Sequence, residues 1–193
     1  MHTSPRQLMA LAFALSLGAA ISLGITRFAY GLLLPAMRAD LSWTYALAGA
    51  MNTVNALGYF LGALITPALM RRFGPSRVLS VGALLAGVFM VLSGFFVDAA
   101  PLLVQRLLAG IASAFVFIAG GLLAARLGAR DPQRAGLLLG VYYGGTGWGI
   151  SLSALDMQIA AHALEAKAVL VSSDAAFLHA AQLQIQNWMD AIR

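Results

Sequence analysis

The chain of 193 residues contains no cysteine, and only 10% of its residues are charged. The absence of cysteine excludes disulfides, thiolate catalysis and cysteine metal ligands. The low charged fraction argues against an ordinary soluble domain, in which about a quarter of the residues are charged. Hydrophobic residues make up 61% of the chain, and its mean hydropathy is +0.84. The composition therefore predicts a protein that lies mostly in a membrane.

Five apolar runs are long enough to cross a bilayer core as helices, which takes about 20 residues. They lie at 8–34, 46–69, 78–97, 102–125 and 136–154. The first run follows Arg6 and has small residues at 18–20, as a cleavable signal peptide would, but it continues well past that point. The sequence predicts an all-α polytopic membrane domain over residues 1–154, with about five transmembrane helices.

Arginines are distributed unevenly among the connections between these runs. Seven lie at the N-terminus and after the second and fourth runs, whereas the alternate connections hold one, Arg38. By the positive-inside rule the N-terminus is predicted to be cytoplasmic, and five spans would leave residues after 154 outside. The seven are Arg6, Arg71, Arg72, Arg77, Arg126, Arg130 and Arg134.

Two further arginines, Arg27 and Arg106, fall inside predicted spans, and no span contains a carboxylate. A charged side chain in hydrocarbon costs about 2.5–3.5 kcal/mol on insertion scales, so it usually faces a bundle interior or an aqueous cavity. One interpretation is snorkelling to the interface or bonding to carbonyls of a neighbouring helix. The other is a positive cavity that binds an anionic substrate or takes part in coupling.

Polar side chains line one face of the second span. Asn52, Asn55 and Tyr59 are spaced i, i+3 and i+7, which places them on one side of a helix. Such a face can line an aqueous cavity or hold two helices together through hydrogen bonds. Glycine-containing small-xxx-small pairs at 58/62, 110/114 and 140/144 predict close helix packing.

These features, taken in order, resemble the N-terminal half of a major facilitator superfamily transporter over residues 8–150. In the first span, 27–31 reads Arg-Phe-Ala-Tyr-Gly and precedes Leu34-Pro35-Ala36-Met37. In the fourth, Arg106-x-x-x-Gly110-x-x-x-Ala114 matches the family motif whose arginine is implicated in coupling. The fifth carries Gly140-x-x-x-Gly144-Gly145-x-Gly147, similar to the family's glycine-rich motif with Gly145 where proline is usual.

The connection at 71–77 (Arg-Arg-Phe-Gly-Pro-Ser-Arg) resembles the superfamily's cytoplasmic gating loop. It departs from that pattern in two places, because Arg71 stands at the usual aspartate and Pro67 at the usual leading glycine. The resemblance implies the loop's position but not its charge relay.

The last forty residues differ in pattern and charge. Residues 155–193 carry two basic and four acidic residues, against ten and three before them. The segments at 156–163 and 169–177 resemble the third and fourth acidic motifs of VapC-type PIN-domain ribonucleases, and 183–188 resembles their final strand. The sequence predicts a short α/β tail here: an amphipathic helix, a buried strand, a short helix and a short strand.

In that ribonuclease family, clustered carboxylates hold Mg²⁺ or Mn²⁺. Only Asp156 and Asp174 match the acidic positions, and a helix-capping or surface role is the favoured interpretation of each. We therefore expect no enzyme activity, no cofactor, no resident metal and no nucleic-acid partner.

The prediction for the whole chain is a secondary transporter of an unidentified small molecule, with an anion favoured, in a bacterial inner membrane. The sequence suggests a truncated form, without full function, joined to a remnant of a PIN domain. The alternatives left open are a metal-dependent ribonuclease fragment and an accessory membrane protein.

Overall fold

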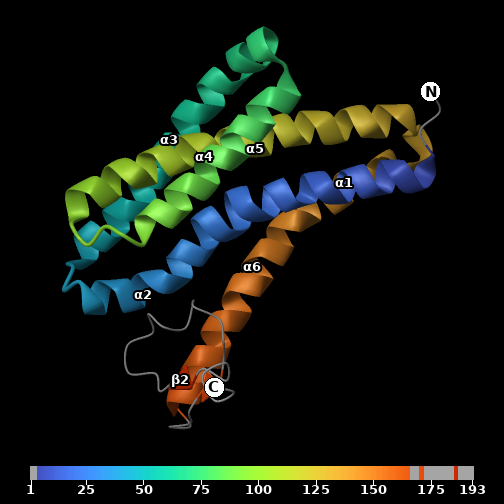
Figure 1. The fold of residues 1–193 in the computed structure, drawn as a ribbon. Helices are drawn as coiled ribbons and strands as arrows, with labels where there is room; N and C mark the ends of the chain where they lie inside the picture. Colours follow the sequence, from blue (N-terminus) through green and yellow to red (C-terminus); the bar gives the residue numbers. More distant parts are fainter. Residues whose placement is uncertain (1–3, 166–169, 172–184, 187–193) are drawn as a thin grey trace, which may run out of the picture. The chain divides into compact units, whose positions relative to one another are not determined.

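The computed structural model describes residues 4–165, 170–171 and 185–186, with side chains for 4–154 except 29, 33, 36, 40 and 153 (Figure 1). The chain divides into two compact units, Met1–Ser151 and Leu152–Arg193. All of the described side chains belong to the first unit, except those at 152 and 154.

The first predicted span forms one continuous helical path of three segments: α1 (Pro5–Ala19), the π-helix η1 (Ala20–Ala29) and α2 (Tyr30–Asp40). Ser4 and Gln7 make a reciprocal capping box at its start, and Pro5 occupies the first helical position. A π-helix of ten residues is unusual, because π-helical geometry normally appears as a single turn within an α-helix.

The remaining helices are α3 (Tyr45–Phe73), α4 (Pro75–Ser93), α5 (Ala99–Arg130), the short 3₁₀-helix η2 (Pro132–Arg134) and α6 (Ala135–Glu165). The Thr44 side chain caps α3 by accepting a hydrogen bond from the Leu47 N–H. Gly74 alone separates α3 from α4 and has φ = +83°, a conformation that glycine adopts without strain.

Four helical segments of the described part are long and apolar enough to cross a membrane: Pro5–Leu32, Tyr45–Phe73, Pro75–Ser93 and Ala99–Arg130. They contain the first four runs predicted from the sequence, apart from a few residues at the ends. The fifth run, 136–154, is helical within α6 but is not among these four segments, so its crossing of the membrane stays a prediction.

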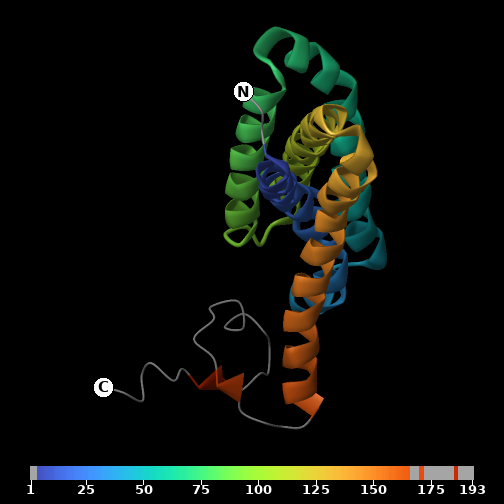
Figure 2. The ribbon, with the colours of Figure 1, turned by 90° about the vertical axis from the view of Figure 1, so that its right-hand side faces the viewer.

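Helix α5 is the centre of the first unit. It packs against α3, α4, α1 and η1, and Figure 2, which looks nearly along α5, shows it surrounded by them. Small residues on α5 make this possible, since they let neighbouring backbones come close. A side chain at Gly110 would clash with the backbone of Asn55 on α3, and one at Gly58 would clash with Leu107 on α5.

Helix α6 approaches the first helical path through glycines other than the predicted pair. A side chain at Gly145 would clash with the backbone of Ser16, and one at Gly149 would clash with Ala20. A Cβ at Gly140 or Gly144 would meet no atom of the described residues within 4 Å. The predicted close contact through the 140/144 pair is therefore not found in the described part, and the contact lies on the adjacent face.

The tail differs from the predicted α/β arrangement. Helix α6 continues without a break from Ala135 to Glu165, so the end of the apolar pattern at 154 is not the end of a helix. Residues 155–165 contain no glycine or proline that would interrupt it. Beyond it, β1 (Leu170–Val171) pairs in parallel with β2 (Ile185–Gln186). Two paired dipeptides are too short to form a sheet layer, so the described residues form a helical protein.

The seven arginines of the predicted cytoplasmic side are exposed. They lie at every second connection along the chain, counted from the N-terminus. They flank the start of α1, the α3–α4 turn and the α5–α6 connection. The α2–α3 and α4–α5 connections lie together at the left of Figure 1. This alternation agrees with the arginine pattern, although it does not show which side faces the cytoplasm.

Candidate substrate-binding and coupling site

Arg106 on α5 is buried, with 2% of its surface exposed. Its Nη1 donates a hydrogen bond of 3.1 Å to the Thr26 carbonyl on η1. The guanidinium carbon lies 3.8 Å from the centre of the Tyr30 ring on α2, a cation–π contact. Within the first interpretation from the sequence, the Arg106 side chain bonds to a carbonyl of a neighbouring helix and does not snorkel to the interface. The second interpretation, a role in substrate binding or coupling, stays a prediction.

The backbone next to the Thr26 carbonyl departs from α-helical hydrogen bonding, at the end of the π-helix. In an α-helix the Tyr30 N–H would donate to Thr26, but here it donates to the Arg27 carbonyl instead. The Thr26 hydroxyl donates to Ile21, five residues earlier, at 2.6 Å. The local helix geometry and the position of Arg106 are thus part of one arrangement.

Several polar atoms around Arg106 have no hydrogen-bond partner among the described residues. They are Nε and Nη2 of Arg106 itself and the hydroxyl of Tyr30, whose ring contacts the guanidinium. A buried donor without a partner costs about 1–3 kcal/mol, and more when it is charged. Arg106 therefore retains hydrogen-bonding capacity in a region that has lost contact with water.

The sequence left two roles open for the polar face of α3, a contact between helices and the lining of a cavity, and its residues divide between them. Asn55 is buried, and its Nδ2 donates a 2.9 Å hydrogen bond to the backbone carbonyl of Arg106. This side chain joins α3 to α5. Asn52, one turn earlier, is exposed and lines a cavity, and Tyr59 is half-buried below Arg27.

Arg27 lies on that cavity, between α3 and the first helical path. The cavity has a volume of about 330 Å³ and is lined by Arg27, Phe28, Gly31, Asn52, Thr53 and Ala56. The Arg27 guanidinium carbon lies 5.9 Å from the centre of the Tyr59 ring. This volume is within the usual range for small-molecule pockets, roughly 300–1,000 Å³. A cationic group beside amide and hydroxyl groups can bind an anion with several polar contacts.

The five residues selected from the sequence thus fall into two connected groups. Arg106 and Asn55 form the buried contact between α5, α3 and η1, while Arg27, Asn52 and Tyr59 lie around the cavity. Thr26 and Thr53 were missed, because nothing in the sequence shows a π-helix or which turn of α3 meets Gly31. Tyr30 lies within the 27–31 motif, which was the available signal for it.

The described residues contain no group of three or more histidine or acidic side chains that could hold a metal ion. The weak metal candidates from the tail are not placed by the structure. Asp156 lies in α6 but its side chain is not among those described, and Asp174 is outside the described residues.

Comparison with known families gives one match. Residues 19–191 match the family described as the uncharacterised MFS-type transporter YbfB. The chain belongs to this family. The match covers most of the chain and confirms the resemblance to major facilitator superfamily transporters that the sequence showed over residues 8–150. No curated protein and no solved structure matches the chain.

Membership in the MFS-type family makes the chain a multi-pass membrane protein of transporter type, in a family whose members typically are not enzymes. The lipid bilayer and an unspecified small molecule are its implied partners. The family match extends through residues 155–191, across the segment interpreted as a PIN-domain remnant. The fusion is therefore not supported, and neither is the ribonuclease alternative that depended on it.

Proposed function

We propose that this MFS-type transporter carries a small organic anion and that the Arg27 cavity is part of its substrate site. The observation that carries the proposal is the cavity itself, where an arginine, an asparagine and a threonine converge between two membrane-crossing segments. None of the four segments contains a carboxylate to neutralise Arg27. An anionic ligand would supply the missing counter-charge in a setting where charge is costly.

In this proposal Arg106 is the coupling residue, in keeping with the fourth-helix motif that it occupies. It contacts Thr26, the residue directly before Arg27, and Asn55, one turn from Asn52. A shift of the first helical path relative to α5 would therefore alter the Arg106 contacts and the cavity together. Superfamily transporters place substrate near the midplane, between two bundles that rock against each other. The cavity is proposed as one bundle's contribution to that site.

We further propose that the protein lies in a bacterial inner membrane with its N-terminus in the cytoplasm, as the arginine pattern predicts.

Transport currents from proteoliposomes that contain the full chain would test the anion proposal. Lactate and succinate serve as anionic probes, and ethanolamine and putrescine as cationic counterparts of similar size. We expect current with an anion and none with the amines, with the anion current lost in Arg27→Gln and partly kept in Arg27→Lys. Currents with the amines alone, or an Arg27→Gln variant as active as the parent, would overturn the proposal.

A further inference from the structure

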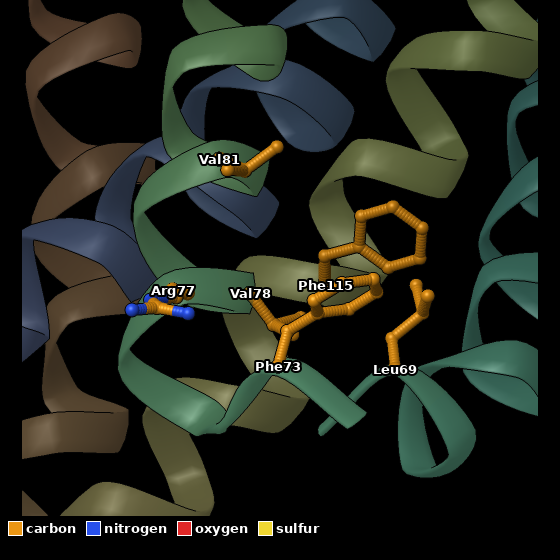
Figure 3. A pocket seen from close by; sticks show the side chains of 6 residues that line it. All are labelled: Leu69, Phe73, Arg77, Val78, Val81 and Phe115. Carbon is orange, nitrogen blue, oxygen red and sulfur yellow. The ribbon is translucent and has the colours of Figure 1, made fainter. Parts of the chain in front are cut away.

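A second cavity lies near the α3–α4 turn, away from Arg27, and the proposed transport cycle makes no use of it. It has a volume of about 290 Å³ and is bounded by residues of α3, α4 and α5. Figure 3 shows its lining residues: Leu69, Phe73, Arg77, Val78, Val81 and Phe115. Five of the six are hydrocarbon or aromatic side chains, so the body of any ligand that fills the cavity must be apolar.

The single charged residue is at the edge of this cavity. Arg77 is exposed, and in Figure 3 it lies on the opposite side of the lining from Leu69 and Phe115. A long side chain at such a position can place its apolar stem against the cavity and its charge at the margin. A ligand that satisfies both parts is apolar along its length and anionic at one end.

The surroundings of the margin add to the positive charge. Arg71 and Arg72 lie in the last turn of α3, and no acidic residue lies between 41 and 97. The Arg72 guanidinium carbon lies 5.3 Å from the centre of the Phe73 ring, which lines the cavity. Arg77 and Arg72 therefore lie at the margin of the apolar cavity, and Arg71 adds a third positive charge next to Arg72 in the chain, without a counter-charge on either adjoining helix.

The cavity also lies where a membrane lipid can reach it. Phe73 is 46% exposed and Val81 is 54% exposed, so the lining is open at the outer surface of α3 and α4. Both helices are candidate membrane spans, and the arginine pattern predicts that their common end lies at the membrane surface. At Gly82 the α4 backbone comes close to Phe115, which fixes the inner wall.

We propose that this cavity is a binding site for an anionic phospholipid, with one acyl chain along Leu69, Val81 and Phe115 and the phosphate at Arg77. Basic pockets between membrane helices bind anionic lipid headgroups, and each arginine near the surface contributes roughly a fivefold gain in affinity. The occupant is a lipid and not a soluble anion, because an anion alone would leave the apolar lining unfilled.

Native mass spectrometry of the delipidated full chain, titrated with phosphatidylglycerol or with phosphatidylcholine of the same acyl chains, would test this site. We expect phosphatidylglycerol to bind at least about fivefold more tightly. Arg77→Gln should lower that preference about fivefold and Arg77→Lys should keep it. The matched control, Arg130→Gln, removes an exposed arginine from the other basic connection and should leave the preference unchanged.

Val81→Trp should weaken the binding of both lipids, because the larger side chain fills the cavity. This variant is compared with the parent only if the two proteins have the same melting temperature. If the melting temperature of Val81→Trp differs, Arg77→Gln still decides the test, because a substitution at an exposed position is expected to leave the fold intact. Equal binding of the two lipids by the parent, or equal losses in Arg77→Gln and Arg130→Gln, would overturn the site. So would displacement of the lipid by glycerol 3-phosphate at equal concentration, which would indicate a soluble-anion site. A dimer that Val81→Trp dissociates, without bound lipid, would assign the surface to a second copy.

Discussion

Arg106 has the largest fully buried side chain in the described part of the protein. It combines one hydrogen bond to Thr26 and stacking on Tyr30 with two guanidinium nitrogens that have no partner there. The cation–π contact contributes about 2 kcal/mol when desolvated, and the hydrogen bond from the charged group contributes about 1.5–3 kcal/mol. Against this, the two unpaired donors together cost about 2–6 kcal/mol. These terms nearly cancel, so stability alone does not explain an arginine at this position.

The first prediction follows from that balance. Arg106→Leu should change the free energy of unfolding by less than about 1 kcal/mol, because it removes the favourable contacts together with the unpaired donors. Uptake should nevertheless be lost in this variant, and Arg106→Lys should also be defective because it lacks the planar, forked donor geometry. Reversible unfolding in sodium dodecyl sulfate, alongside uptake into proteoliposomes, provides the two readouts. A large loss of stability, or unimpaired uptake, would show that Arg106 is structural.

The two asparagines of α3 allow a matched comparison at the same scale. Asn55→Ala removes the buried hydrogen bond to Arg106 and should cost about 0.6–2 kcal/mol, the range measured for hydrogen bonds between membrane helices. Asn52→Ala, at an exposed cavity position, should leave the unfolding free energy unchanged and weaken anion binding instead. The same unfolding titration measures both variants. If Asn52→Ala were the more destabilising, the division of this face into structural and cavity positions would be wrong.

The helical elements show which parts of the fold can be predicted from sequence. Long apolar runs between arginine-rich connections predict the spans, because the hydrophobic thickness of a bilayer sets their length. The π-helix at 20–29 has no comparable signal in its sequence, and it packs against α5, which is distant along the chain. For the same reason the pairing of Arg106 with Thr26 could not be predicted, although both arginines were found as isolated charges in apolar segments.

The contact between α6 and the first helical path leads to the next prediction. Gly145→Val or Gly149→Val should destabilise the protein by about 1–3 kcal/mol or more, because the added side chain meets backbone atoms that cannot move aside. Gly144→Val and Gly147→Val lie on the same helix, with no described atom within 4 Å of the added Cβ, and serve as controls. Melting temperatures in detergent would rank the four variants. Equal effects on both pairs would mean that this helix contact does not form as described.

At the scale of the whole molecule, the family match changes the interpretation of the tail. A drop in hydrophobicity and a reversal of charge after residue 154 suggested a separate fused domain, yet the match to the MFS-type family continues to residue 191. Composition reports the environment of a segment, and it does not show where a family's sequence pattern ends. The domain boundary at 154 stays a prediction, as does the orientation of the chain in the membrane.

The orientation gives a prediction that labelling can test. The chain has no cysteine, so single cysteines at Ser76 and Asp98 would be the sole reactive thiols. With the N-terminus in the cytoplasm, an impermeant thiol reagent added from the periplasm should label position 98 and leave position 76 unlabelled. The opposite pattern would reverse the topology.

The central claim of this account is that the Arg27 cavity is accessible to water and selects anions. Thr53 is exposed and lines the cavity, so Thr53→Cys places a single thiol there with little change in volume. The decisive measurement is the ratio of its reaction rates with anionic and cationic methanethiosulfonate reagents in detergent, normalised to the ratio for 2-mercaptoethanol. We expect a normalised ratio above one that falls to one or below when Arg27→Gln is added, and that Arg6→Gln leaves unchanged. An unreactive thiol, or a ratio that Arg27→Gln does not alter, would contradict the account.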